Sequence, residues 1–290
     1  MKIRFIINPI SGKAKHQRLE KKIEKNLDLN KFDFDYFYTE HPKHATELAQ
    51  KAASEKIDVV VAVGGDGTMH ECANGLLGSQ TALAVLPCGS GNGFAFHFGM
   101  HRDIDKAIQQ LNISDFKIID SCTANGLPFF NVSGVGFDAH IANLFATTKV
   151  RGFSSYVKLV LGECANYPAQ DYTIEYDDKK QIHNAVIISW ANATQFGNGA
   201  QISPESITDD GLIDICILKD FKRYLVPVLL YQLFTGKIHH SKYMTIIRTK
   251  KAKISCQNGL SHLDGEGVDL SKEIIIDTHP KTLKVFIPYG

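Results

Sequence analysis

One carboxylate stands among glycines in the segment Gly64-Gly65-Asp66-Gly67-Thr68, which directly follows the apolar run 59–63. Glycines carry no Cβ atom, so their backbone N–H groups can approach a phosphate closely. A helix that begins here would also point its positive dipole end at that phosphate. Asp66 itself repels phosphate, which makes sense if it holds a divalent cation or removes a proton from an attacking hydroxyl. The alternative is that Asp66 only caps the helix.

Two other apolar runs end in loops of the same kind. The run 3–7 leads into Asn8-Pro9-Ile10-Ser11-Gly12-Lys13, and the run 82–86 leads into Pro87-Cys88-Gly89-Ser90-Gly91-Asn92-Gly93. Ser90 and Asn92 offer hydrogen bonds to a phosphate or a ribose. Because parallel strands end at one edge of a sheet, the three loops are expected to meet at one ligand crevice. Neither the G-x-G-x-x-G fingerprint with its distant acid nor the P-loop motif is present, so the common dinucleotide sites and P-loop ATPases are not favoured.

Short apolar runs alternate with charged amphipathic stretches up to about residue 120. This alternation predicts an α/β domain with a parallel sheet. The expected strands are 3–8, 32–38, 59–63 and 82–86, and the expected helices are 14–27, 42–54, 69–77 and 103–111.

Strands dominate beyond residue 120. A hairpin is expected where Asn125-Gly126 separates the runs 116–121 and 129–132, because this dipeptide favours a tight turn. The other expected strands are 172–176, 185–191, 212–218, 244–249, 252–256, 273–276 and 283–287, with helices near 138–148, 154–165 and 224–234. We therefore expect two domains, residues 1–120 and 121–282, and the last strand, near 283–287, is a candidate to return to the first domain. The cleft between the domains is the expected active site.

The composition excludes several classes of function. Lys and Arg number 32 and Asp and Glu 31, so the formal charge of +1 provides no basic field for nucleic acid. The first residues lack a signal peptide pattern, and the apolar run 224–234 is too short to span a bilayer, so a cytoplasmic protein with no transmembrane segment is expected. Six scattered cysteines without a C-x-x-C pair predict reduced core thiols, and His97 and His101 lack the H-E-x-x-H pattern of a zinc site.

Acidic residues also occur in two turns of the second half. Asp209 and Asp210 precede Gly211, and Asp264-Gly265-Glu266 separates two apolar runs. Each Asp-Gly pair alone is a common turn. Carboxylates facing a phosphate crevice are nevertheless what Mg²⁺-dependent phosphoryl transfer requires, because the cation neutralises phosphate charge and a carboxylate can deprotonate the acceptor alcohol.

These motifs, in this order, resemble the diacylglycerol kinase catalytic-domain family, which includes soluble bacterial diacylglycerol kinases, related lipid kinases and the sphingosine and ceramide kinases. The resemblance extends over nearly the whole chain. It implies an α/β N-terminal domain with three layers, similar to phosphofructokinases and NAD kinases, and a β-rich sandwich as C-terminal domain. It also implies ATP-dependent, Mg²⁺-dependent transfer of the γ-phosphate to a lipid hydroxyl.

The resemblance also implies roles for individual residues. Glu266 would be the general base, although in members similar to sphingosine kinases Asp66 is the stronger candidate. Asp210, with the backbone carbonyls of Ile207 and Leu212, would form a Mg²⁺ site that is either catalytic or structural. The residues expected to hold ATP are Asn8, Ser11, Lys13, Thr39, Gly64, Gly65, Asp66, Gly67, Thr68, Met69, His70, Glu71, Gly89, Ser90 and Asn92.

Departures from the family pattern concern the substrate. Many bacterial members have G-T-x-N-D-F-A-R where this chain has Gly89 to Phe96, so an acid and an arginine are missing, whereas Met69-His70-Glu71 looks more like sphingosine kinases. The expected acceptor is therefore diacylglycerol or a sphingosine-like long-chain base at a membrane surface, with Asp138 at its head group or, equally, in a core turn. Two alternatives are a kinase of a soluble alcohol and a non-catalytic nucleotide-binding protein. A homodimer is left open.

Overall fold

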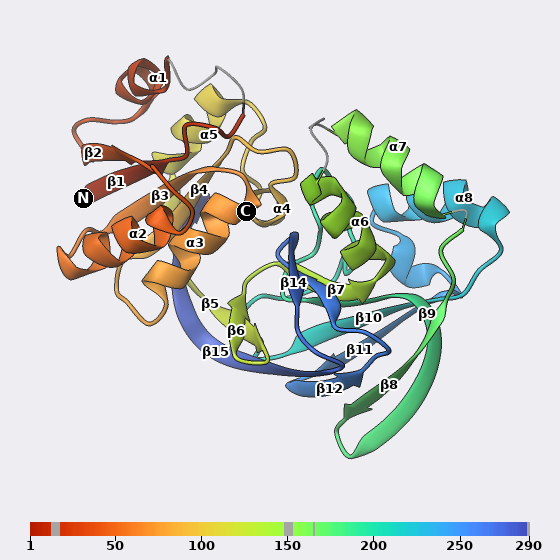
Figure 1. Ribbon diagram of the computed structural model, residues 1–290. Coiled ribbons are helices and arrows are strands. Elements are labelled where there is room, and N and C mark those ends of the chain that lie inside the picture. The colour runs from red at the N-terminus through yellow and green to blue at the C-terminus, as the bar shows by residue number, and fades with distance from the viewer. Residues whose placement is uncertain (13–17, 148–152, 165, 289–290) are drawn as a thin grey trace. The chain divides into compact units, whose positions relative to one another are not determined.

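The computed structural model describes residues 1–12, 18–147, 153–164 and 166–288 (Figure 1). The chain forms two compact units. The first unit is Met1–Ile119 together with Lys281–Gly290, and the second unit is Asp120–Pro280. Strands β5 (Ser114–Ala124) and β15 (Glu273–Pro288) each contribute one end to either unit.

A parallel sheet forms the centre of the first unit. Its strands follow the order β2 (Asp33–Tyr38), β1 (Lys2–Ile7), β3 (Val59–Gly64) and β4 (Ala82–Pro87), and the C-terminal part of β15 continues it in parallel, Val285 pairing with Leu83. All six residues of β3 and of β4 are buried, as expected for inner strands covered on both faces. The apolar runs therefore give the expected strands.

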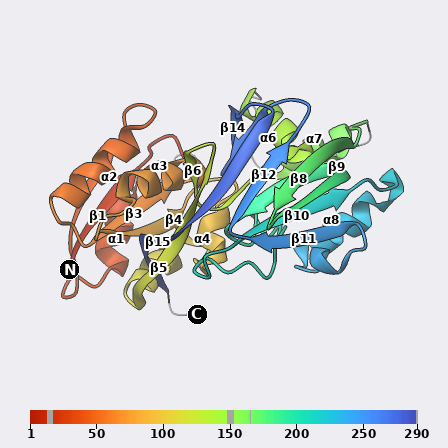
Figure 2. The ribbon, with the colours of Figure 1, turned by 90° about the horizontal axis from the view of Figure 1, so that it is seen from below.

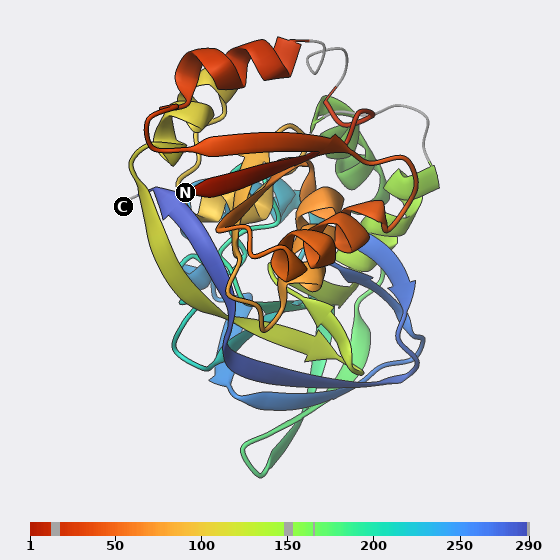
Figure 3. The ribbon, with the colours of Figure 1, turned by 90° about the vertical axis from the view of Figure 1, so that its left-hand side faces the viewer.

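Helices cover both faces of this sheet. α1 (Leu19–Asn26) packs against α5 (Ile104–Leu111) on one face, and α2 (His44–Ser54) packs against α3 (Asp66–Leu76) on the other (Figure 3). The short α4 (Gly93–His97) follows β4. The result is the helix, sheet, helix layering that the alternating sequence predicts.

Two groups of strands enclose the main core of the second unit (Figure 2). β9 is long enough to join both groups, because its N-terminal half pairs with β8 while its C-terminal half lies between β7 and β10. Trp190 is fully buried in this core. The strands are β6 (Leu127–Phe129), β7 (Val132–Gly136), β8 (Gln170–Tyr176), β9 (Lys179–Ala191), β10 (Ile213–Lys219), β11 (Met244–Thr249), β12 (Lys251–Ser255), β13 (Leu260–Leu263) and β14 (Glu266–Asp269).

A second core lies under the helices of this unit, α6 (Phe137–Thr147), α7 (Phe153–Cys164) and α8 (Val226–Phe234). Strand β10 lies between the two cores, because its successive side chains point alternately to one core and to the other. Ile215 faces the core between the strands, and its neighbour Cys216 faces the helices. Short 3₁₀ turns, η2 (Arg223–Leu225) and η3 (Ile238–His240), flank α8. None of the described helices is long and apolar enough to cross a membrane.

Several expectations are confirmed and others need correction. β5 and β6 form the hairpin around Asn125-Gly126, and all six cysteines are free thiols. The two strands expected at 273–276 and 283–287 are instead one strand, β15. Helix α4 and strands β13 and β14 were not expected. The helix expected at 14–27 is described from Leu19 onward.

Candidate functional site

The three glycine loops meet within the first unit, at the carboxyl ends of β1, β3 and β4. The backbone N–H of Asn8 donates to the carbonyl of Val63 (3.0 Å), and Asn8 Nδ2 donates to Thr68 Oγ1 (3.2 Å). The chain continues from β1 to β2 on one side and from β3 to β4 on the other. This point is a topological switch point, where open α/β sheets bind their ligands.

Glycine is required where these loops touch. Gly12 has a φ of +78°, and a side chain there would collide with the carbonyl oxygen of Cys88. A side chain on Gly89 would collide with the Cα atom of Gly65. The loops therefore approach one another backbone to backbone, at distances that a side chain would not allow.

Asp66 fixes the third loop to the second. It is the first residue of α3, and its two carboxylate oxygens accept hydrogen bonds from the backbone N–H groups of Asn92 and Gly93, both at 2.8 Å. The side chain of Asn92 in turn accepts from the N–H of Gly89 (2.9 Å) and donates to its carbonyl (2.8 Å). Ser90 lies exposed at the tip of this closed loop.

The other residues expected to hold ATP differ in their exposure and in their hydrogen bonds. Thr39 lies at the end of β2 beside β1, its N–H donating to the carbonyl of Ile7 (2.9 Å), and Ser11 is half-buried in the first loop. The carboxylate of Glu71 accepts from the N–H groups of Lys43 and Ala45 and so caps α2. Met69 is fully buried, and its backbone N–H donates to the carbonyl of Gly65 (3.1 Å). His70 is partly buried in α3, and Lys13 lies outside the described residues.

Glu266 is held by a tight turn in the second unit. Asp264 and Gly265 connect β13 and β14 with φ values of +49° and +91°, as in a type I′ hairpin. The buried carboxylate of Asp264 accepts from the N–H groups of Phe130 (3.0 Å) and Asn131 (2.8 Å). Glu266 follows this anchored turn as the exposed first residue of β14.

Asp138 belongs to a buried polar cluster that sequence reasoning missed. Its Oδ2 accepts from Ser189 Oγ (2.7 Å) and lies 3.2 Å from His262 Nε2, and all three side chains are buried. His262 Nδ1 accepts from the N–H of Gly265 (3.2 Å), the residue before Glu266. Asp138 is thus buried among hydrogen-bond partners, as the alternative of a core turn expects, and a contact with the lipid head group stays a prediction.

The loop 207–212 offers oxygen atoms that suit Mg²⁺. Asp210 is exposed, with Oδ1 accepting from the N–H of Leu212 (2.9 Å), and Ile207 is exposed as well. The buried Asp120 anchors the loop, since its Oδ2 accepts from Gly211 N–H (2.7 Å) and its own N–H donates to Thr208 (2.7 Å). Mg²⁺ binds through oxygen atoms, often one or two carboxylates together with water, so the exposed carboxylate of Asp210 is a suitable ligand type.

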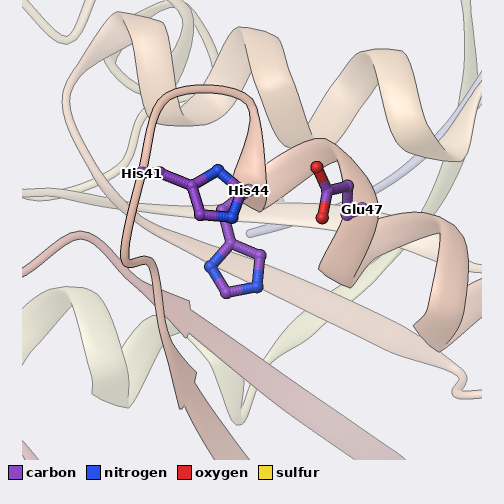
Figure 4. A group of neighbouring side chains, drawn as sticks. All are labelled: His41, His44 and Glu47. Atoms are coloured by element: carbon purple, nitrogen blue, oxygen red, sulfur yellow. The ribbon is translucent and has the colours of Figure 1, made fainter.

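Among the described residues, one group of three or more His, Cys, Asp or Glu side chains is close enough to share a metal ion: His41, His44 and Glu47 (Figure 4). The two imidazole rings are stacked, with centroids 4.5 Å apart and an angle of 9° between their planes. Nitrogen lone pairs lie in the ring planes, so they do not converge on one ion here. His44 Nδ1 already accepts from the N–H of Glu40 (3.0 Å), and the positive end of α2 disfavours a cation. We assign no metal to this group.

Comparisons with known proteins cover almost the whole chain. Residues 2–124 match the model of the diacylglycerol kinase catalytic domain, and residues 131–287 match that of the YegS C-terminal NAD kinase beta sandwich-like domain. A diacylglycerol kinase of Bacillus subtilis is 28% identical over 279 residues, which cover 91% of this chain and 89% of that protein. A probable lipid kinase, YegS-like, of Shewanella frigidimarina is 27% identical over 247 residues, covering 82% of this chain and 79% of that protein.

Solved structures show the same fold. A crystal structure from Bacillus anthracis matches with a TM-score of 0.83 at 25% identity, covering 100% of this chain and 97% of that one. A second Bacillus anthracis structure, of a diacylglycerol kinase, matches with a TM-score of 0.74 at 22% identity over the same shares of the two chains. The α/β unit and the β-rich unit are thus confirmed as the expected fold class.

Proposed function

The chain belongs to the diacylglycerol kinase family, in which a diacylglycerol kinase catalytic domain is followed by a YegS C-terminal domain, and from this membership we propose that it is an ATP-dependent lipid kinase. It transfers the γ-phosphate of ATP to the hydroxyl of diacylglycerol or of a sphingosine-like long-chain base. The observation that carries this proposal is the meeting of three glycine loops at the switch point of the first unit, with Asn8 bonded to Thr68.

The phosphates of ATP are bound by these loops. Backbone N–H groups at Gly64 to Thr68 and the N-terminus of α3 provide a concave, positively polarised surface. Thr39 and Ser11 lie at the ends of the adjacent strands β2 and β1, and Ser90 is exposed on the third loop. This arrangement supports binding of a triphosphate mainly through backbone groups, which explains why neither common nucleotide motif is present.

Glu266 acts as the general base and Asp66 as a positioning residue. Both oxygens of Asp66 already accept backbone hydrogen bonds, so this carboxylate is occupied in holding the third loop. Glu266 is exposed at the start of β14, on a turn fixed by Asp264. An exposed carboxylate on an anchored turn is better suited to accept a proton from an arriving alcohol.

Mg²⁺ would be held in the second unit by Asp210 and the backbone carbonyls of Ile207 and Leu212. A cation bound there would supply positive charge, either to fix this loop or to offset phosphate charge. Asp120, hydrogen-bonded to the N–H of Gly211, fixes the conformation of this loop. Asp120 is therefore a positioning residue for the metal loop.

The test uses purified protein with radiolabelled ATP, Mg²⁺ and mixed micelles containing either diacylglycerol or sphingosine. A labelled lipid is expected, and the preferred micelle identifies the acceptor. Asp66→Asn should abolish the labelling. Transfer to a soluble alcohol in the absence of lipid would replace this proposal with a kinase of soluble alcohols. ATP binding without turnover on any lipid would show a non-catalytic nucleotide-binding protein.

A further inference from the structure

Helix α8 exposes an apolar stripe to solvent. The exposed fractions are 73% for Tyr224, 51% for Val228, 63% for Tyr231 and 39% for Phe234. Tyr224 lies in η2, the turn that leads into α8, and at 100° per residue the three positions within α8, with the exposed Pro227, fall within about one third of the helix circumference. We call these four side chains the α8 stripe. A surface helix of a globular protein ordinarily carries charged or polar residues on this side.

The opposite side of α8 is firmly packed. Leu229 is buried in the core under the helices, and Val226 and Leu233 pack against the same core. The helix is thus apolar all round, with Gln232 its single polar side chain. A helix of this kind is either buried or in contact with another apolar phase. Because the anchored side fixes its orientation, the α8 stripe is a permanent feature of the surface.

The charges around α8 are mainly basic, although the exposed acids Asp220 and Glu205 lie beside it, paired with Arg223 and His239. Residues 221–243 contain three lysines and one arginine and no Asp or Glu, although the whole chain carries a formal charge of only +1. Lys222, Lys237 and Lys242 are exposed, and the first two lie just beyond the ends of the α8 region. Arg223 is bonded to Asp220 and to the carbonyl of Tyr167, so it contributes less net charge to the surface. Exposed lysines beside an apolar stripe are typical of helices that bind anionic lipid.

We propose that the α8 stripe docks the protein on the surface of an anionic lipid membrane. The helix lies parallel to that surface, since its nine residues are too few to span a bilayer. Val228 and Phe234 enter the acyl boundary, Tyr224 and Tyr231 lie at the level of the head groups, and the lysines contact lipid phosphates. A second copy of the chain is disfavoured as the occupant, because two identical basic patches would repel each other.

This inference gives the proposed lipid kinase a route to its substrate, and in that sense it rests on the proposed function. The docking step itself uses neither ATP nor any residue of the glycine loops. Membrane binding and phosphoryl transfer can therefore be measured separately.

Flotation of the protein with vesicles, in the absence of ATP, tests the proposal. Binding to vesicles of phosphatidylcholine and phosphatidylglycerol is expected, with much weaker binding to phosphatidylcholine alone and a loss of binding as salt is raised. The double variant Val228→Ser/Tyr231→Ser should lower the partition coefficient at least about tenfold. The matched control is Tyr36→Ser/Ile182→Ser, which removes one exposed tyrosine and one exposed β-branched residue elsewhere and should leave the partition coefficient unchanged.

A kinase assay separates the two proposals. If the α8 double variant phosphorylates lipid in detergent micelles as well as the wild type but loses activity on vesicles, docking through α8 is supported. Vesicle binding by a wild-type protein that phosphorylates no lipid would overturn the proposed function and leave the docking proposal standing. Unchanged vesicle binding by the double variant would overturn docking through α8. Loss of a lipid-free dimer in the double variant, seen by analytical ultracentrifugation, would assign the stripe to a second copy instead.

Discussion

His262 and Asp138 form a buried pair, with Nε2 of the imidazole 3.2 Å from Oδ2 of the carboxylate. His262 Nδ1 accepts the N–H of Gly265, so the proton of the neutral ring resides on Nε2 and is donated to Asp138. Hydrogen bonds thus connect α6, through His262, to the turn that carries Glu266. The buried carboxylate of Asp138 thus supports the turn that carries the proposed general base.

We expect Asp138→Asn to disturb both stability and catalysis. The amide would direct a donor at Ser189, His262 or the N–H of Ala139, each of which now donates to Asp138, so the free energy of unfolding should fall by about 1–3 kcal/mol. In addition, kcat should fall while the KM for ATP is retained, because the turn before Glu266 loses its support. Urea unfolding and steady-state kinetics measure the two effects. Asp171→Asn, an exposed acid in β8 of the same unit, is the control. A stability loss without a change in kcat would reduce Asp138 to a structural residue.

The sequence alone was sufficient to predict that the three glycine loops lie at one edge of the sheet. Each loop follows an apolar run, and parallel strands end at a common edge, so local patterns fixed both the fold and the meeting of the loops. The contacts Asn8 to Thr68 and Asp66 to Gly93 could not be derived, but their neighbourhood could. What the pattern leaves undecided is whether Asp66 performs chemistry or holds a loop, because both roles require an acid at the start of α3.

The remaining features depend on tertiary packing. His262 and Asp138 are 124 residues apart, and a buried histidine shows no signal in a single sequence until its partner is known. Pro280 and the polar residues around it predict that the strand is interrupted between residues 276 and 283. Strand β15 nevertheless continues through this segment, because these residues are largely exposed and an exposed strand position tolerates a proline. Helix α4 is too short for a periodic pattern. Charge and hydropathy patterns in the sequence thus predict the layers of the fold more readily than they predict its buried networks of polar side chains.

Asp66 and Glu266 should respond differently to loss of charge. Asp66→Asn places an amide donor against a backbone N–H of the third loop, so ATP should bind more weakly and activity should fall on the order of 10³-fold. Glu266→Gln should lower kcat by roughly 10²–10⁴-fold with ATP affinity retained, because only the proton acceptor is lost. Isothermal titration with ATP and steady-state kinetics distinguish the two. If Glu266→Gln kept full activity, Asp66 would be the general base after all.

Gly89→Ala should separate the second and third loops. The added methyl group would meet Gly65, so the loops must move apart, and the affinity for ATP should drop at least about tenfold, equivalent to 1.4 kcal/mol. Gly162→Ala in α7 is the matched control, because open space surrounds Gly162 and alanine favours a helix by about 1 kcal/mol. Nucleotide titration and thermal unfolding of both variants are the measurements. Equal ATP affinity for the two would contradict close contact of the loops.

His97 makes the stability of the first unit depend on pH. Burial, with a smaller contribution from Lys117, lowers the pKa of its imidazole from 6.5 to about 4. Between these values the unfolded chain binds the proton and the folded protein does not, so stability is complete above pH 6.5 and declines as pH falls toward 4, by up to about 1.4 kcal/mol per pH unit. His97→Gln removes the titrating group and should flatten this part of the curve, whereas the same substitution at the exposed His240 should not. Urea unfolding across this range is the measurement, and an unchanged slope in His97→Gln would assign the acid sensitivity to other groups. Because α4 follows the third glycine loop directly, protonation of His97 should also weaken ATP binding below pH 5, before the rest of the protein unfolds.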